Sequence, residues 1–397
     1  MVTRQGWIAA IGSFACVIAA RLLGSFELFL LGVIGIAVVV FAVTFVWIRR
    51  LRVEVVRDIV PLRVHAGGSS RVDLTVVNRG TRRTPVLRLR DPVTGTRGAN
   101  LLIGPLAPGD AARASYRLPT DRRGIVDIGP MQLTVTDPFG LAQTSLDGPA
   151  TASLTVFPPA YSLGVLPPTG GSDPHAGFDR HRTLNRGGDE FHALRPFTVG
   201  DELRRVHWPS TARHDELMVR QDELPWQGRL TVVVDNSLHV PMPALDLATS
   251  VAASVLQTAH HKGNLVRLVT GNGLDSGFTS GNGQLESLLE LLAVLQPRRD
   301  ASISRALDRA ATQVRNGGAV VVTPETDPAK LADIQRLGRG FAAVVLVMLD
   351  ASAWDPDAPE GVPSGGRRVV RISRSAPFPE AWHRSMAVGL DAAGARA

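Results

Sequence analysis

The most distinctive stretch of the chain, residues 187–222, reads GGDEFHALRPFTVGDELRRVHWPSTARHDELMVRQD and leads into RLTVVVD at residues 229–235. Charged and large apolar side chains alternate densely in the first part. Arginine and aspartate become buried among apolar residues only when they are paired, because an unpaired ion is too costly to remove from water. We therefore predict an ordered segment built on ion pairs, followed by a buried strand that ends in Asp235.

We interpret the ion-pair segment as a structural clamp between two domains rather than as a catalytic site, because networks of this kind also serve architecture. We expect these residues to contact another part of the chain or a partner protein. The residues expected to form it are Arg195, Asp201, Arg204, Trp208 and Arg213.

Gly187–Phe191 spells GGDEF, the signature of diguanylate cyclases. In those enzymes the motif forms a hairpin turn that holds a nucleoside triphosphate, and an upstream strand carries a metal-binding aspartate. The residues before it here, LGVLPPTGGSDPHAGFDRHR, are rich in proline and glycine and predict no such strand. Without its structural context, a five-residue match does not indicate a cyclase.

Beyond residue 229, apolar strands alternate with helices, which indicates a parallel sheet covered on both faces. Binding sites in such sheets lie at the carboxyl ends of strands, where Asp235 and Ser237 are expected. The strands are predicted at residues 229–234, 264–270, 319–323 and 342–349, and the helices at 244–261, 283–295, 302–315 and 329–337. Residues 351–397 are expected to form a partly flexible tail around a strand at 368–372 and a helix near Glu380.

Residues 53–157 are rich in short strand patterns, such as RVDLTVV at 71–77, separated by turn signals such as Asn78-Arg79-Gly80. This spacing predicts an all-β sandwich, expected to act as a spacer or an interaction module. A linker rich in proline and glycine follows at residues 158–186, and residues 187–350 hold the ion-pair segment with the α/β domain.

Residues 1–50 contain two apolar runs, 7–23 and 28–48. The second run is long enough to span a hydrocarbon core of about 30 Å, and the first suffices if Arg21 reaches the interface. A cleaved signal peptide is the alternative for the first run, but the second favours a transmembrane hairpin. Arginines before the first run and after the second place both ends, and the bulk of the chain, in the cytoplasm.

The formal net charge is +7 and the sequence pI about 10.7. Lys262 and Lys330 are the only lysines, which is typical of arginine bias in a GC-rich bacterial genome. Basic residues are dispersed and no nucleic-acid-binding motif is present, so no nucleic-acid partner is expected. The single cysteine, Cys16, excludes an intramolecular disulfide and a cysteine-based metal cluster.

Several motifs together carry a family resemblance over most of residues 1–350. They are the apolar hairpin, DPFGL at 137–141, Glu190-Phe191, Leu194-Arg195, Gly200-Asp201, Arg204, Trp208, Ala212-Arg213 and the strand ending in Asp235. The chain resembles the domain-of-unknown-function 58 family, membrane proteins with a von Willebrand factor A-like, Rossmann-like domain. The resemblance implies that fold and a partner among MoxR-type AAA+ ATPases, but no reaction.

Von Willebrand factor A-like domains often carry a metal-ion-dependent adhesion site, and the resemblance implies a partial one here. Asp235 and Ser237 match its Asp-x-Ser-x-Ser motif, whereas His239 replaces the last serine. The threonine position falls near Ala301, beside Ser302, and the third-loop aspartate falls on Pro324, beside Glu325. Mg²⁺ needs a full shell of oxygens, so these ligands make an incomplete site. In the alternative, Asp235 caps a backbone turn.

No catalytic serine elbow and no Walker A loop is present, so ATP hydrolysis would come from a partner. Two functions remain open. The first is a membrane-tethered interaction module that couples a cytoplasmic AAA+ ATPase to a membrane process. The alternative is a divalent-metal-dependent hydrolase centred on Asp235, which would require a bound metal ion such as Mg²⁺.

Overall fold

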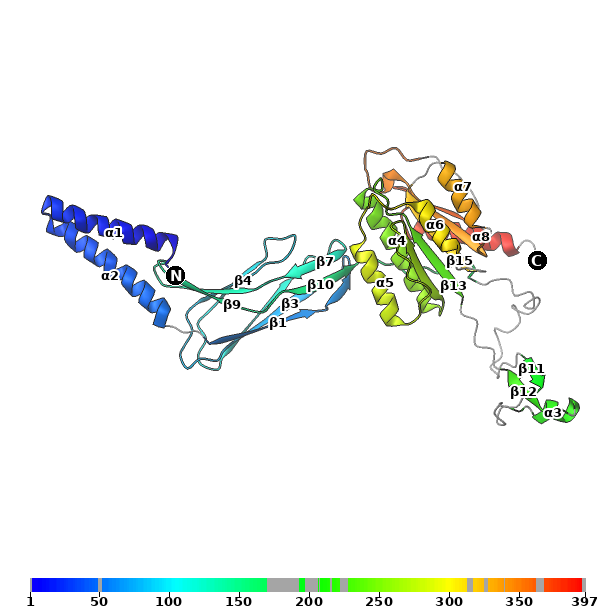
Figure 1. Ribbon diagram of the computed structural model, residues 1–397, viewed down its shortest axis with the longest axis horizontal. Coiled ribbons are helices and arrows are strands. Elements are labelled where there is room, and N and C mark those ends of the chain that lie inside the picture. Colours follow the sequence, from blue (N-terminus) through cyan, green and yellow to red (C-terminus); the bar gives the residue numbers. More distant parts are fainter. Residues whose placement is uncertain are drawn as a thin grey trace. The chain divides into compact units, whose positions relative to one another are not determined.

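The computed structural model describes residues 2–48, 52–169, 193–196, 206, 208–214, 216–221, 228–312, 317–324, 328–338, 340–361 and 368–394. The chain divides into two compact units, Met1–Pro159 with Leu289–Val294 and Ala160–Leu288 with Leu295–Ala397. Two apolar helices come first, β-sheets follow, and a parallel sheet with helices forms the C-terminal part (Figure 1). The mixed fold class expected from the sequence is confirmed in this outline.

The N-terminal helices are α1 (Arg4–Leu23) and α2 (Phe26–Ile48). Thr3 caps α1 by accepting a hydrogen bond from the Gly6 N–H at 3.0 Å, and Gly24 ends it in the left-handed region. A methyl group on Gly32 would lie 2.9 Å from the Ser13 carbonyl oxygen, so glycine permits the close approach of the two helices. Both helices are long and apolar enough to cross a membrane.

Ten strands follow in three sheets, with the orders β1-β3-β6, β2-β10-β7 and β5-β4-β8-β9. Along β3, every second side chain points into a shared apolar core, which includes Leu74, Leu89 and Leu154. The strands are β1 Val53–Val60, β2 Arg63–His65, β3 Arg71–Asn78, β4 Leu87–Asp91, β5 Ala99–Ile103, β6 Ala111–Arg117, β7 Gly124–Ile128, β8 Gln132–Thr136, β9 Gln143–Asp147 and β10 Ala152–Phe157.

A buried polar triad joins two of these sheets. The Arg57 guanidinium of β1 donates to Asp91 Oδ1 of β4 at 3.0 Å, and the Tyr116 hydroxyl of β6 donates to Asp91 Oδ2 at 2.6 Å. Asp91 is fully buried, and the Arg57 side chain is only 2% exposed. Burial and the Asp91 carboxylate raise the pKa of Tyr116, which therefore remains a hydrogen-bond donor.

The DPFGL turn at residues 137–141 connects the β-sheet region with the first helix. Asp137 accepts hydrogen bonds from the backbone N–H groups of Phe139 at 2.8 Å and Ala142 at 2.5 Å. The Leu141 carbonyl oxygen of this turn accepts a hydrogen bond from the Thr3 backbone N–H at 2.8 Å. The residue that caps α1 is therefore bonded to the turn that Asp137 shapes.

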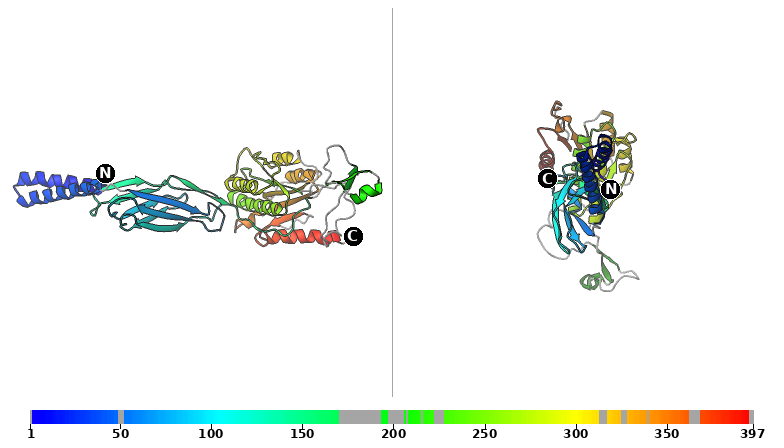
Figure 2. Two further views of the ribbon diagram at one scale, coloured as in Figure 1. Left: turned by 90° about the horizontal axis from the view of Figure 1, so that it is seen from below. Right: turned by 90° about the vertical axis from the view of Figure 1, so that its left-hand side faces the viewer.

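The second unit contains a five-stranded parallel sheet with the order β14-β13-β15-β16-β17 (Figure 1). Its strands are β13 Arg229–Val234, β14 Leu265–Thr270, β15 Gly318–Pro324, β16 Ala343–Leu349 and β17 Val369–Ile372. The helices in this part of the sequence are α4 Met242–His261, α5 Asn282–Val294, α6 Ile303–Ala311, α7 Pro328–Leu337 and α8 Glu380–Gly394 (Figure 2), and Leu289–Val294 at the end of α5 are grouped with the first unit. Apolar residues of α6 and α7 share a buried cluster with Val233 and Val321.

Segments on both sides of the expected α/β domain also pack within this unit. The strand expected at 368–372 is β17, which pairs with β16. Trp382 of α8 is fully buried, and its indole N–H donates to the Val165 carbonyl oxygen at 2.8 Å. Leu163, from the segment expected as a linker, is 2% exposed and donates its N–H to Thr258 on α4.

The triad of Arg57, Asp91 and Tyr116 yields a stability prediction. Asp91→Ala leaves a buried guanidinium without its partner and is expected to cost about 3–5 kcal/mol. Tyr116→Phe removes one hydrogen bond and is expected to cost about 1–2 kcal/mol. Hydrogen exchange of the β4 amides measures both losses as opening free energies.

The control is Asp73→Ala, which breaks the exposed ion pair between Asp73 and Arg71. That change is expected to cost less than about 1 kcal/mol. Equal effects of Asp91→Ala and Asp73→Ala would contradict the assigned role of the buried triad.

Candidate functional site

Asp235 directly follows β13, and its carboxylate is fully buried. Oδ1 accepts a hydrogen bond from the Ser237 backbone N–H at 3.0 Å and another from the Ser237 hydroxyl. Oδ2 accepts one from the Thr323 hydroxyl at 3.1 Å. These donors compensate the carboxylate for its lost hydration, which would otherwise make burial costly. The contact with the Ser237 N–H is an Asx turn, which closes the strand.

Thr323 belongs to this cluster although the sequence did not single it out. Val234 of β13 pairs with Val322 of β15, so the next residue of each strand, Asp235 and Thr323, lie side by side. The adhesion-site pattern pointed to Pro324, one residue later. Threonine is an ordinary strand residue, so it carries no distinctive signal at the end of an apolar strand.

Asn236 ties the neighbouring loops to this edge of the sheet. It is fully buried, and its side chain donates to the Gln296 carbonyl oxygen at 3.1 Å. The same side chain accepts the Asn272 backbone N–H, just beyond β14, at 3.1 Å. The backbone around Asp235 is therefore fixed from both sides.

The loop after Asp235 presents side chains to solvent. The residues Leu238 and Met242 are 55% and 40% exposed, whereas Val240 between them is 1% exposed. The His239 side chain is 53% exposed, and its Nε2 lies 3.8 Å from Asp235 Oδ2. The site thus consists of a buried carboxylate beneath an exposed surface of mixed apolar and imidazole character.

The structure brings together only some of the ligands expected for a magnesium site. The oxygens that converge are those of Asp235, Ser237 and Thr323. Ser302 begins α6 nearby, with its N–H bonded to the Gly271 carbonyl oxygen, whereas Glu325 lies outside the described residues. Within the described part of the chain, no group of three or more His, Cys, Asp or Glu residues could hold a metal ion. This donor set falls short of the six oxygens that Mg²⁺ prefers.

Asp350 repeats the arrangement of Asp235 at the end of β16. Both begin an Asp-x-Ser sequence, and Asp350 Oδ1 accepts the Ser352 N–H at 2.9 Å. Its Oδ2 accepts two hydrogen bonds from the Arg371 guanidinium, at 2.6 and 3.1 Å. The Asp-x-Ser pattern therefore closes a strand here with no metal ligand role, and by itself it does not identify a metal site.

The two carboxylates differ in what balances their charge. Burial favours a higher pKa for Asp350, but hydrogen bonds from Ser352, Arg371 and Gly361 outweigh it and lower the pKa to about 2. No arginine or lysine among the described residues forms an ion pair with Asp235, whose nearest basic group is the imidazole of His239. At Asp235, the negative charge is stabilised mainly by the dipoles of hydroxyl and backbone amide groups.

The predicted ion-pair segment is described only in part. Arg195 lies in β11 (Ala193–Pro196), which pairs with β12 (Met218–Gln221) in a two-stranded antiparallel sheet. Trp208 and Arg213 lie in α3 (Trp208–His214), and both side chains are exposed, that of Trp208 by 64%. Asp201 and Arg204 lie outside the described residues. The clamp thus stays a prediction, and Trp208 presents its ring to solvent.

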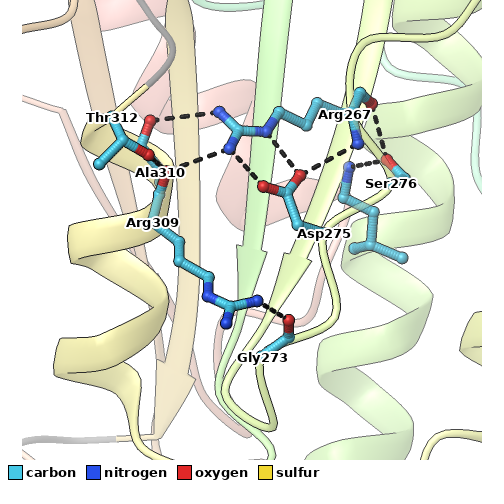
Figure 3. A network of polar contacts seen from close by, with 9 residues as sticks. Arg267, Gly273, Asp275, Ser276, Arg309, Ala310 and Thr312 are labelled. Atoms are coloured by element: carbon cyan, nitrogen blue, oxygen red, sulfur yellow. Dashed lines mark hydrogen bonds and ion pairs between the residues drawn. The ribbon is translucent and has the colours of Figure 1, made fainter.

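A buried arginine, Arg267 in the middle of β14, was not anticipated from the sequence. Its guanidinium donates to both oxygens of Asp275, at 2.8 and 2.6 Å, and to the carbonyl oxygens of Arg309 and Ala310 (Figure 3). The hydrogen bonds from Arg267 lower the pKa of Asp275. The network fastens the segment after β14 and the end of α6 to an edge strand, which suits a structural role.

Fold and site together define a mixed α/β protein in which buried aspartates close the carboxyl ends of parallel strands. Residues 193–352 match the model of the family described as "Protein of unknown function DUF58", which supports the family resemblance found in the sequence. The match begins at the first residue of β11 and ends at Ser352, in the turn that Asp350 caps. None of the curated proteins compared with the chain matches it.

Some solved structures resemble parts of the chain. The CARDB domain of a Pyrococcus furiosus protein is 20% identical, with 27% of this chain and 91% of that chain covered and a TM-score of 0.21. A beta-glucosidase from Listeria innocua is 12% identical, with 25% of this chain and 16% of that chain covered and a TM-score of 0.17. Likenesses this weak carry no argument about function.

The lowered pKa of Asp350 predicts a pH-dependent contribution to stability. The pKa of Asp350 is about 2 in the folded protein, below the ordinary 3.8, so its ionised carboxylate stabilises the fold fully above about pH 4. This stabilisation is lost as the pH falls through 2. Asp350→Asn is expected to lower the free energy of unfolding by about 2 kcal/mol at pH 6. This difference should shrink towards zero near pH 2.

Urea unfolding of the wild type and of Asp350→Asn at both pH values measures the difference, and other titrating groups cancel in the comparison. An effect of the same size at both pH values would show that the Asp350 charge is not its source.

Proposed function

We propose that this chain is a membrane-anchored protein-interaction module and a partner of a MoxR-type AAA+ ATPase. The two apolar helices support the anchor, and the family match over residues 193–352 supports the family resemblance, from which the partner is inferred. In this proposal the second unit has a von Willebrand factor A-like fold. The parallel strand order and the polar carboxyl edge support that assignment.

The proposed orientation places the bulk of the chain in the bacterial cytoplasm. Arg4 is the first residue of α1, and Arg49, Arg50 and Arg52 follow α2, while the connection between the helices carries no arginine or lysine. Short segments rich in arginine remain on the cytoplasmic side. A cytoplasmic ATPase would then have access to both units.

The observation that carries the proposal is the loop after β13. A buried carboxylate begins this loop, with both oxygens hydrogen-bonded to the protein, and the loop exposes Leu238, followed by the exposed Met242 at the start of α4. Such an arrangement offers a contact surface rather than a reactive group, since exposed apolar side chains beside a rigid edge favour association. The exposed ring of Trp208 provides a second contact of the kind that dominates interfaces.

A divalent-metal-dependent hydrolase centred on Asp235 is the second candidate. The observation favouring it is that Asp235, unlike Asp350, has no guanidinium partner among the described residues. A cation could therefore balance its charge, with Ser237 and Thr323 as neighbouring oxygen ligands. The short donor set makes this candidate the weaker one.

The orientation is tested with reporter fusions after Ala397. A reporter active only in the cytoplasm is expected to give signal, and one active only outside the membrane is expected to be silent. The reverse pattern would remove the cytoplasmic ATPase as a partner.

The interaction surface is tested with the purified full chain and a purified MoxR-type ATPase from the same organism. Leu238→Ser and Trp208→Ser are each expected to weaken binding by about 1–3 kcal/mol if the side chain lies in the core of the interface. Biolayer interferometry gives the dissociation constants.

The matched control is Leu102→Ser, because Leu102 is 70% exposed on β5 in the other unit. This variant should bind as the wild type does. No measurable binding of the wild type, or equal losses in all three variants, would reject the proposed surface.

Whether the protein binds a divalent metal ion is tested with the same purified chain. The interaction module is expected to retain no stoichiometric divalent metal and to show the same Tm with and without Mg²⁺. One ion per chain, lost in Asp235→Asn, would instead support the hydrolase.

A further inference from the structure

A cavity of about 1150 Å³ lies within the first unit, between the end of α2 and the loop after β3. Phe41, Phe45 and Ile48 line one wall. These residues are spaced by four and three positions, so they share one face over the last two turns of α2. The apolar wall is therefore a continuous strip of a helix that is long and apolar enough to cross a membrane.

The opposite wall is basic. It consists of Arg52 and residues 78–85, NRGTRRTP, which contribute Arg79, Arg82 and Arg83. Among the described residues, no aspartate or glutamate lines the cavity. Its described lining thus combines four arginines with an apolar strip and contains no acidic side chain.

The loop that carries these arginines is fixed at both ends. Asn78 is 1% exposed, and its side chain donates to the carbonyl oxygens of Arg82 at 2.8 Å and Leu106 at 3.0 Å. Thr84 is 4% exposed, and its hydroxyl accepts the Leu106 N–H at 2.9 Å. Because the backbone is held in this way, the arginine side chains start from a preorganised position, which lowers the entropic cost of binding.

The four arginines differ in whether their guanidinium groups are paired within the described part of the protein. Arg79 pairs with Glu54 at 2.7 Å on the exposed surface. The guanidinium groups of Arg52, Arg82 and Arg83 have no hydrogen bond or ion pair among the described residues. A cluster of positive charge costs free energy through repulsion unless an anion occupies it. Guanidinium forks match the oxygens of a phosphate group, which they bind through paired hydrogen bonds.

We infer that this cavity binds an anionic phospholipid, with the headgroup phosphate on Arg82 and Arg83 and an acyl chain along Phe41, Phe45 and Ile48. A soluble phosphate would use the basic wall alone, whereas a lipid uses both walls. Arg52 closely follows α2 in the sequence, and Arg82 and Arg83 line the same cavity as Ile48 at the end of that helix, which is the depth expected for headgroups if α2 spans the membrane. The inference goes beyond partner binding and rests on the proposed membrane anchor.

The test uses the full chain in neutral detergent micelles, to which dioleoyl phosphatidylglycerol or dioleoyl phosphatidylcholine is added. Native mass spectrometry counts the bound lipid at each concentration. The wild type is expected to prefer phosphatidylglycerol. Arg82→Gln with Arg83→Gln is expected to weaken phosphatidylglycerol binding roughly 30-fold, since two charges are removed.

The matched control is Arg113→Gln with Arg117→Gln, which removes the same charge from exposed positions on β6, outside the cavity. It should retain the preference, and unchanged phosphatidylcholine binding shows that each variant is folded. Equal binding of both lipids by the wild type, or an equal loss in the control, would overturn the inference. Inorganic phosphate that binds as tightly as phosphatidylglycerol would overturn the lipid assignment.

The outcome is independent of the ATPase experiment. The Arg82 and Arg83 variant leaves α1, α2, Leu238 and Trp208 unchanged, so it should bind the ATPase as the wild type does. Failure of the ATPase proposal would leave the lipid preference intact.

Discussion

A buried carboxylate must receive hydrogen bonds from the protein, and this constraint organises the points where strands end in this chain. Asp137, Asp235 and Asp350 each directly follow a strand and are at most 4% exposed. Each accepts the backbone N–H of the residue two positions later, which is the Asx turn. The remaining carboxylate oxygen then fixes a different part of the fold in each case.

The second partner determines what each turn does. At Asp350 it is the Arg371 guanidinium of β17, so the carboxylate holds the edge strand of the sheet. At Asp137 it is the backbone of Ala142, and the resulting turn bonds to Thr3 at the start of α1. At Asp235 it is the Thr323 hydroxyl, which links two adjacent strand ends without a formal positive charge. Asp235 therefore differs from Asp350 in its electrostatics rather than its geometry, and it shares uncharged donors with Asp137.

Local patterns predicted the parallel strands and the apolar helices closely, because continuous apolar runs and long spans carry their own signal. β1 lacks a regular apolar alternation, since Arg57 occupies an inward position and only its distant partner Asp91 explains a charge there. β2, with three residues, and β9, with the polar sequence QTSLD, lack a clear pattern. Asp235 and Ser237 were found from their spacing. The roles of Thr323 and Arg267 could not be predicted from neighbouring sequence. They depend on the register between β13 and β15 and on how the segment after β14 folds back.

The hydrogen bond between Thr3 and the DPFGL turn gives the apolar hairpin a second attachment to the β-sheet region. The first attachment is the chain itself, which runs from α2 into β1. Two parts of a chain that are joined at one point can rotate about it, whereas parts joined at two points resist such rotation. Gly6 reinforces the second attachment, since a methyl group there would clash with the Leu141 carbonyl oxygen. The close packing of α1 on the turn thus constrains how the β-sheet region can move relative to the hairpin.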